Sequence, residues 1–263
     1  MFFTSRIKVF RDLGACCSKQ KTAITYETTV FPTADIEKIV QTLKTDGLSC
    51  GLNLPDDLLL EILKFSKYTR YLGNANPHFP FFLDEKVKAE AQYQCRFVSA
   101  HSLNPAQHCL AVQMLENDAT LWKIAADYLG TQPVLVESRI RWIFAIGGVV
   151  DEPLRGIFKF HYDLEDYRFI KFIFYLTDVD RRSCPHACIR GSHQHKKLSH
   201  QFSLLRERTD QEMIDYYGKD RIKAIYGPAG FGFVEDFYCF HKATLPVYRD
   251  RLILETKFAM NRY

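Results

Sequence analysis

The spacing of apolar residues changes character about halfway along the chain. Between about residues 34 and 130, apolar residues recur at intervals of three and four, which is typical of helices with one buried face. Start and stop signals predict three helices: one from Ile36 to a stop at Gly47, one opened by Pro55, and one from Asp118 to Gly130. The segment 70–83, which is rich in proline and asparagine, is expected to be a loop.

From about residue 134 the apolar residues alternate with polar ones or form short runs, and both patterns indicate strands. A single late helix is expected after Thr209, which forms a capping box with Glu212. Helices followed by many short strands predict a mainly β fold in which N-terminal helices support a β-sandwich or barrel. No linker divides the chain, so one domain is expected over residues 1–263, with helical support at about 34–130 and a β core at about 134–260. The predicted strands are Val134–Ile146, Ile157–Leu164, Phe169–Leu176, Cys188–Arg190, Phe231–Val234 and Leu252–Phe258.

Composition and charge narrow the possible functions. The 263 residues are 47% hydrophobic and 25% charged, as in globular proteins, and the 14% of aromatic residues favours a β-rich core. A net charge of +4, evenly spread, argues against a nucleic-acid or membrane surface. Charged residues such as Arg6 and Lys8 interrupt any apolar signal segment, and no apolar run approaches the roughly 18 residues of a membrane span. A cytoplasmic protein with mostly reduced cysteines is therefore expected.

Candidate chemistry begins with a histidine and an aspartate two positions apart. On a strand, His161 and Asp163 share one face, where both side chains can bind the same metal ion. A surface histidine beside a solvated aspartate explains such a triplet equally well when it is taken alone. A second imidazole, His241, follows 80 positions later, after the glycine-rich turn at 227–232. Two histidines and one carboxylate form the ligand set associated with non-haem Fe(II) oxygenases, so these three residues are predicted to be both metal ligands and catalytic residues.

An arginine ten residues after His241 extends this pattern. The guanidinium of Arg251 can bind a carboxylate through two parallel hydrogen bonds, as an organic-acid co-substrate would require. Arg249 has the same strand parity, so alternation does not separate the two arginines. Arg251 is preferred because the apolar run 252–254 continues its strand directly.

Taken together, these segments resemble the phytanoyl-CoA dioxygenase-like family of Fe(II)/2-oxoglutarate-dependent oxygenases. The resemblance runs from about residue 35 to the C-terminus and depends on the order and spacing of several pieces. One piece departs from the family pattern, because Arg190 stands where a proline usually precedes the Gly-Ser-His turn. The matching segments are 128–130 with Pro133, 160–163, 174–180, 190–193, 240–241 and 249–252.

The resemblance implies a double-stranded β-helix, which is a jelly roll of the cupin-like type. It also implies that His161, Asp163 and His241 bind Fe(II), that Arg251 binds 2-oxoglutarate, and that O2 is the second co-substrate. The expected reaction is hydroxylation of a small molecule with release of succinate and CO2. The carboxylate of Asp163 favours oxygenation over halogenation, because halogenating relatives replace it with a small residue. Tyr167 resembles the position of an aromatic substrate contact in the family.

Further residues leave alternatives open. Lys171 lies in a run that is apolar on both faces, so it is expected either to contact 2-oxoglutarate or substrate, or to extend from the sheet rim to solvent. Cys184 and Cys188, with nearby histidines, allow a zinc protein as an alternative. A jelly-roll binding module without catalytic activity is another alternative. The primary substrate and the oligomeric state are not indicated by the sequence.

Overall fold

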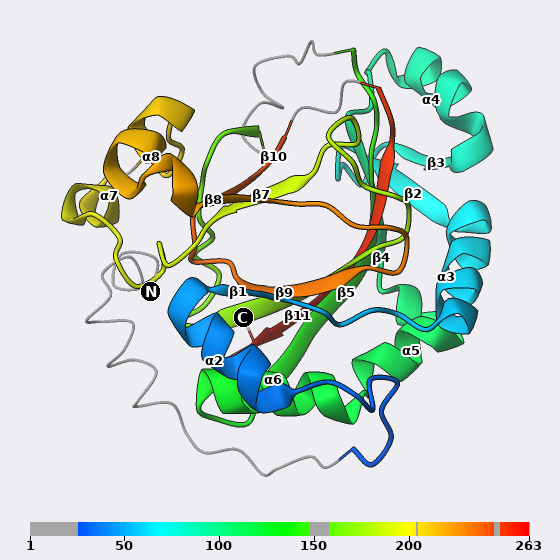
Figure 1. Ribbon diagram of the computed structural model, residues 1–263. Helices are drawn as coiled ribbons and strands as arrows, with labels where there is room; N and C mark the ends of the chain where they lie inside the picture. The colour runs from blue at the N-terminus through cyan, green and yellow to red at the C-terminus, as the bar shows by residue number, and fades with distance from the viewer. Residues whose placement is uncertain (1–25, 148–157, 204, 245–247, 263) are drawn as a thin grey trace.

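Two antiparallel sheets face each other, and most of the helices pack outside the larger one (Figure 1). This arrangement comes from a computed structural model that describes residues 26–147, 158–203, 205–244 and 248–262. It is the mainly β jelly roll with supporting helices that the sequence predicts. The larger sheet has the order β1 (Leu48–Cys50), β9 (Gly232–Asp236), β6 (Phe169–Tyr175), β11 (Arg251–Ala259), β5 (Val134–Ile143), β4 (Ser99–Leu103), β2 (Arg70–Gly73) and β3 (Pro80–Phe82), and the smaller has β10 (His241–Ala243), β7 (His186–Ile189) and β8 (Ile222–Ile225).

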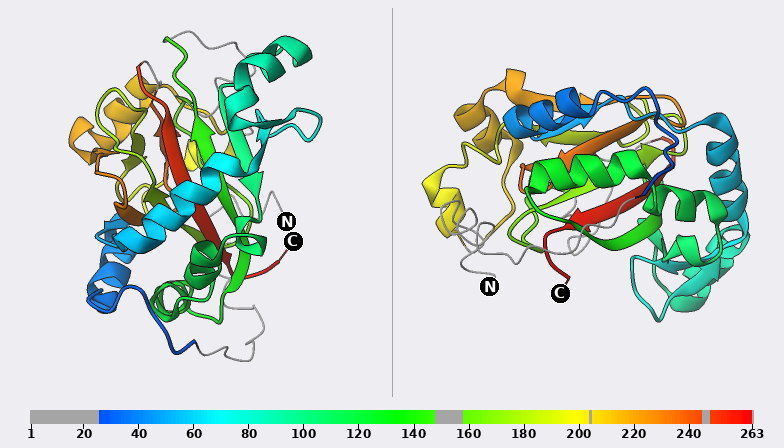
Figure 2. Two further views of the ribbon diagram at one scale, coloured as in Figure 1. Left: turned by 90° about the vertical axis from the view of Figure 1, so that its right-hand side faces the viewer. Right: turned by 90° about the horizontal axis from the view of Figure 1, so that it is seen from below.

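The supporting helices begin and end largely where capping residues predict. Asp118 accepts a hydrogen bond from the backbone of Leu121, and Gly130 ends the same helix in the left-handed conformation. Thr209 caps the late helix by accepting from the backbone of Glu212. In two views α2 and α6 lie across the outer face of the larger sheet (Figure 2). The helices are α2 (Ile36–Asp46), α3 (Asp56–Tyr68), α4 (Lys86–Tyr93), α5 (Leu110–Glu116), α6 (Ala119–Leu129), α7 (Leu198–Phe202) and α8 (Asp210–Tyr217). Within the described ranges, no helix combines the length and the apolar character needed to cross a membrane.

The N-terminal half is less purely helical than predicted. It also supplies β1 to β4, and the predicted loop at 70–83 contains the antiparallel pair β2 and β3. These strands have three to five residues each, too few for an alternating pattern to stand out from the helical one. Pro80 is compatible with β3 because it opens the outermost strand of the sheet, where a missing backbone donor costs little.

The predicted strand at Ile157–Leu164 is wrong as a regular strand. Position 157 lies outside the described residues, and the remainder forms only isolated bridges, at Phe160 and at His161. The predicted alternation of apolar and polar side chains is nevertheless present in this segment. Its apolar members Phe160, Tyr162 and Leu164 are buried in one apolar cluster. The bounds of the other predicted strands also differ by one to three residues: β5, for example, ends at Ile143, and β7 begins two residues earlier than predicted.

The two faces of the larger sheet differ in chemistry. Its outer face packs against α6, where Phe172 and Leu254 join the main apolar core with Ile124. Its inner face, which looks toward the smaller sheet, carries buried charged residues. Both faces are covered, so all seven residues of β6 are buried, and Lys171 is the one charged residue among them. The inner charged residues include Lys171, Glu235, Arg251 and Glu255.

Candidate metal centre

His161, Asp163 and His241 come together between the two sheets. One ligand atom from each side chain lies within 4.8 Å of the others. Reciprocal backbone hydrogen bonds hold His161 and His241 side by side: each amide donates to the other's carbonyl, at 3.0 and 2.8 Å. The amide of Asp163 donates to the carbonyl of Phe237 at 2.9 Å. Elsewhere in the described ranges, no three His, Cys, Asp or Glu side chains are placed closely enough to share a metal ion.

Backbone carbonyls orient both imidazole rings. Nδ1 of His161 lies 2.9 Å from the carbonyl of Lys159, and Nδ1 of His241 lies 3.0 Å from that of Cys239. A carbonyl only accepts, so each Nδ1 carries the hydrogen and each Nε2 keeps a free lone pair. Burial, and after it the neighbouring His161, lower the pKa of His241 to about 3. The ring is therefore neutral at pH 7, as a metal ligand must be.

Lys171 lies against the third ligand. Its ammonium donates to Oδ2 of Asp163 at 3.0 Å and lies 3.9 Å from the centre of the Phe237 ring. Burial acts to raise the pKa of Asp163, but the charge of Lys171 foremost, with smaller contributions from the two histidines, outweighs it and holds that pKa well below its usual range. The lysine thus points into the site rather than along the sheet rim, and it engages one carboxylate oxygen, whereas Oδ1 has no side-chain partner among the described residues.

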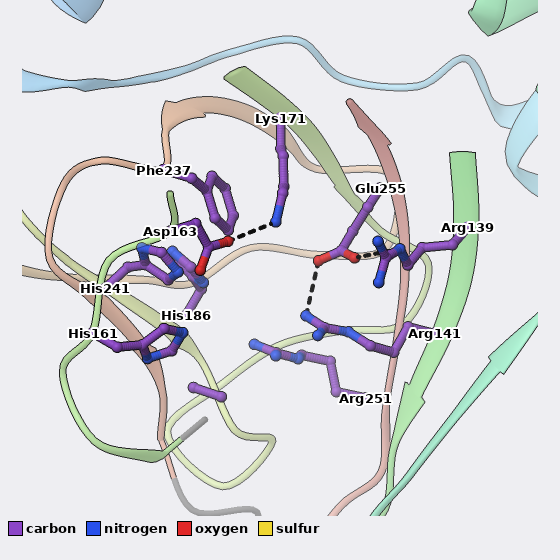
Figure 3. A pocket seen from close by; sticks show the side chains of 11 residues that line it. Arg139, Arg141, His161, Asp163, Lys171, His186, Phe237, His241, Arg251 and Glu255 are labelled. Atoms are coloured by element: carbon purple, nitrogen blue, oxygen red, sulfur yellow. Dashed lines mark hydrogen bonds and ion pairs between the residues drawn. The ribbon is translucent and has the colours of Figure 1, made fainter. Parts of the chain in front are cut away.

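The structure separates the two candidate arginines. Arg251 is 1% exposed and lines the same cavity of about 70 Å³ as the three ligands (Figure 3). Its Nε and Nη1 have no hydrogen-bond partner in the described part of the chain. Arg249 precedes β11, its side chain is 60% exposed, and it forms an ion pair with Asp180 at 3.6 Å. Strand parity does not apply to Arg249, because the strand begins only at Arg251.

Four further ionisable residues of the cavity wall were not predicted as site residues from the sequence: Arg139, Arg141, His186 and Glu255. Arg141 donates to Glu255 at 2.8 Å, and Nε of Arg139 lies 3.8 Å from the same carboxylate (Figure 3). Burial acts to raise the pKa of Glu255, but the two arginines outweigh it and lower that pKa to about 2. A signal was present in the sequence, because charged residues occupy alternate positions of β5 and β11 and alternate positions share one face.

Two sets of predicted residues lie elsewhere. Tyr167 is not part of the cavity wall and packs instead against the main apolar core. Cys184 donates to the carbonyl of Thr244, whereas Cys188 lies in a separate apolar cluster with Cys239. The residues that the structure describes therefore form no zinc-type cluster around these cysteines.

Comparisons with known proteins bear on the fold. No family model and no curated protein sequence matches the chain. Among solved structures, HygX from Streptomyces hygroscopicus, with nickel and 2-oxoglutarate bound, is 14% identical over 84% of this chain and 86% of its own, with a TM-score of 0.55. EctD from S. alaskensis, with bound Fe, is 15% identical over 91% and 82%, with a TM-score of 0.54.

A third similar structure is SnoN, an epimerase from nogalamycin biosynthesis, in complex with Fe3+, alpha ketoglutarate (2-oxoglutarate) and nogalamycin RO. It is 12% identical over 85% of this chain and 82% of its own, with a TM-score of 0.54. The chain therefore has the jelly-roll fold of these three proteins.

Proposed function

We propose that this protein is a non-haem Fe(II)- and 2-oxoglutarate-dependent dioxygenase that hydroxylates a small molecule and releases succinate and CO2. One observation carries the proposal: two imidazole lone pairs and a carboxylate converge in the cavity that also holds a buried arginine with unpartnered donors. The similar structures support it, because HygX and SnoN were crystallised with a metal ion and 2-oxoglutarate.

The donor set fits a divalent cation. Two neutral imidazoles and one carboxylate occupy one side of an octahedral ion and leave positions open for other ligands. When bound, iron together with 2-oxoglutarate and O2 supplies the oxidation of the substrate, coupled to decarboxylation of the 2-oxo acid. Within the chain, Nε2 of His161, Nε2 of His241 and the free oxygen of Asp163 would hold the metal, while Lys171 would keep the other oxygen engaged.

The surplus positive charge fits a dicarboxylate. Arg141 shares the carboxylate of Glu255, and Lys171 pairs with Asp163. Arg251 has no carboxylate partner in the described part of the chain, although it is almost fully buried. A buried cation without an anion is costly, so the far carboxylate of 2-oxoglutarate would complete this pairing.

A small molecule is the substrate class that we propose. HygX and SnoN were solved with hygromycin B and nogalamycin RO bound, respectively. The net charge of +4 gives no sign of a nucleic-acid surface.

Anaerobic addition of Fe(II) and 2-oxoglutarate to the metal-free protein tests the proposal. A weak visible charge-transfer band is expected in the wild type and in the control His195→Ala, whose side chain is exposed, but not in His161→Ala. A folded wild-type protein without the band would refute the proposal. Binding of both molecules without succinate formation, across a broad panel of substrates, would instead indicate a binding module without catalytic activity.

A further inference from the structure

One histidine in the cavity wall is not among the metal ligands. His186 begins β7 and pairs in register with Ala243, two residues beyond His241 on the neighbouring strand β10. It is 7% exposed and lines the same cavity as Arg251 (Figure 3). Its ring stacks on that of His241, with centroids 5.6 Å apart and an angle of 20° between the planes. The imidazole therefore lies at the metal centre in a fixed orientation.

A buried carboxylate from the opposite sheet holds this ring. Nε2 of His186 lies 2.6 Å from Oε2 of Glu235, which belongs to β9 and is 0% exposed. Lys171 is the cross-strand neighbour of Glu235 on β6, but its ammonium turns to Asp163 instead. Oε1 of Glu235 has no hydrogen-bond partner within the described ranges. His186 is thus the group that satisfies this carboxyl.

The contact with Glu235 leaves one ring nitrogen of His186 for the cavity. Oε2 of Glu235 occupies Nε2, so Nδ1 is the nitrogen that remains for a ligand beside Arg251. A carboxylate only accepts hydrogen bonds, so a carboxylate bound there would select the form of the pair in which Nδ1 carries a hydrogen. In that form the second proton of the pair lies between Oε2 and Nε2.

Resting on the function proposed above, we infer that His186, fixed by Glu235, donates a hydrogen bond from Nδ1 to the far carboxylate of 2-oxoglutarate, beside Arg251. The guanidinium of Arg251 points across the cavity toward the histidines (Figure 3). A carboxylate has about four lone-pair sites, and a guanidinium fork occupies two of them. A third donor from the smaller sheet fixes the rotation of the carboxylate about the axis that the fork leaves free. His186 is therefore a binding residue for the co-substrate, and Glu235 is its positioning residue.

Calorimetric titration of the Ni(II)-loaded protein tests this contact. The two probes are 2-oxoglutarate and 2-oxopentanoate, which has a methyl group in place of the far carboxylate. His186→Leu is expected to raise the Kd for 2-oxoglutarate about tenfold or more, since a hydrogen bond to a charged group is lost. The Kd for 2-oxopentanoate is expected to stay within about twofold of the wild-type value. His186→Gln, which retains an N–H donor, is expected to recover most of the loss.

A second buried histidine provides the matched control. His200 is 2% exposed and lies 2.9 Å from Glu212, but it is not part of the cavity wall. His200→Leu is expected to leave both Kd values unchanged. An unchanged Kd for 2-oxoglutarate in His186→Leu, or an equal loss for both acids, would overturn the inference.

Two other outcomes, loss of Ni(II) binding in the variant and failure of the wild type to bind 2-oxoglutarate, are interpreted separately. If His186→Leu does not retain Ni(II) binding, the same comparison is made with His186→Phe, whose ring fills the imidazole's place without a donor. A wild-type protein that binds Ni(II) but not 2-oxoglutarate would refute the proposed function itself, because it fails before any variant is compared.

Discussion

Glu255 is the carboxylate that makes a strongly cationic cavity wall compatible with folding. It is 5% exposed and lies between Arg139 and Arg141, which lower its pKa from 4.5 to about 2. A group whose pKa is depressed in the folded state stabilises that state above its unfolded pKa, and the contribution is lost as the pH falls. The contribution of Glu255 is therefore complete above about pH 5 and disappears between about pH 4.5 and 2.

Glu255→Gln is expected to lower the free energy of unfolding of the metal-free protein at pH 7 by about 3 kcal/mol, as the pKa shift implies. The difference from the wild type should shrink toward pH 2.5, because the carboxyl is then protonated in the unfolded wild type and the pH approaches its folded-state pKa of about 2. Urea unfolding at pH 7, 4.5 and 3 measures the effect, with the exposed Glu37→Gln as the control. A difference that does not change with pH would contradict the assignment.

The two arginines before and at the start of β11 offer a matched test of the co-substrate site. Arg251→Met is expected to raise the Kd for 2-oxoglutarate about 100-fold in the Ni(II)-loaded protein, because a bidentate charged pair is lost. Arg249→Met should change it less than about twofold, since that side chain is exposed and pairs with Asp180. The affinity for Ni(II) should be unchanged in both variants, because neither side chain is a ligand. Equal losses in the two variants would contradict the assignment.

At the scale of the elements, α6 connects the N-terminal segment to the back of the sheet. Asp118 caps the helix through Leu121 and also accepts from the backbone of Val30 at 2.7 Å and from the hydroxyl of Thr29 at 3.1 Å. Its side chain is almost fully buried, so its removal leaves several donors without partners.

Asp118→Ala is expected to lower the free energy of unfolding by about 3 kcal/mol, which is the sum of a lost cap and buried unpaired donors. Asp35→Ala removes an exposed cap of α2 with a single hydrogen bond to Lys38 and should cost about 1 kcal/mol. Urea unfolding of both variants makes the comparison. Equal costs would show that burial of the cap at α6 contributes nothing.

Elements with a strong local signal could be predicted from the sequence. The caps at Asp118, Gly130 and Thr209 mark helix ends through bonds to residues three or four positions away. Strands β6 and β11 contain seven and nine buried residues, long enough for their composition to identify them. The three-residue strands β1 and β3 have no such signal, because they are too short for a pattern to appear, and β1 is held by pairing with the distant strand β9.

The same limit applies to the candidate site. His161 and Asp163 could be paired from their spacing alone, because two positions along an extended segment return to the same face. Glu235 and His186 could not, since 49 positions and a change of sheet separate them. The ligand set of two histidines and one carboxylate suggested the link from His161 to His241, and the order and spacing of the family's segments supported it together with Arg251. The resemblance did not supply Arg139 and Arg141 of β5, which line the cavity.

At the scale of the whole molecule, the site exists only in the folded state. Its residues come from β5, β6, β7, β10 and β11 and from the segments before β6 and between β9 and β10, and they meet only when both sheets have formed. A ligand that binds this site therefore binds the folded state alone, and it stabilises that state by about 2.7 kcal/mol at a concentration 100 times its Kd.

Ni(II) with 2-oxoglutarate is therefore expected to raise the Tm of the wild type by about 5–10 °C, as a gain of this size implies for a chain of this length. 2-Oxoglutarate without metal should give a much smaller shift, because its 2-oxo acid end then has no partner. His161→Ala should show little response to the pair, whereas His195→Ala should respond as the wild type does. Differential scanning calorimetry with and without EDTA measures these shifts. A wild-type shift that survives EDTA would mean that 2-oxoglutarate binds independently of the metal, and the two ligands would not share one site.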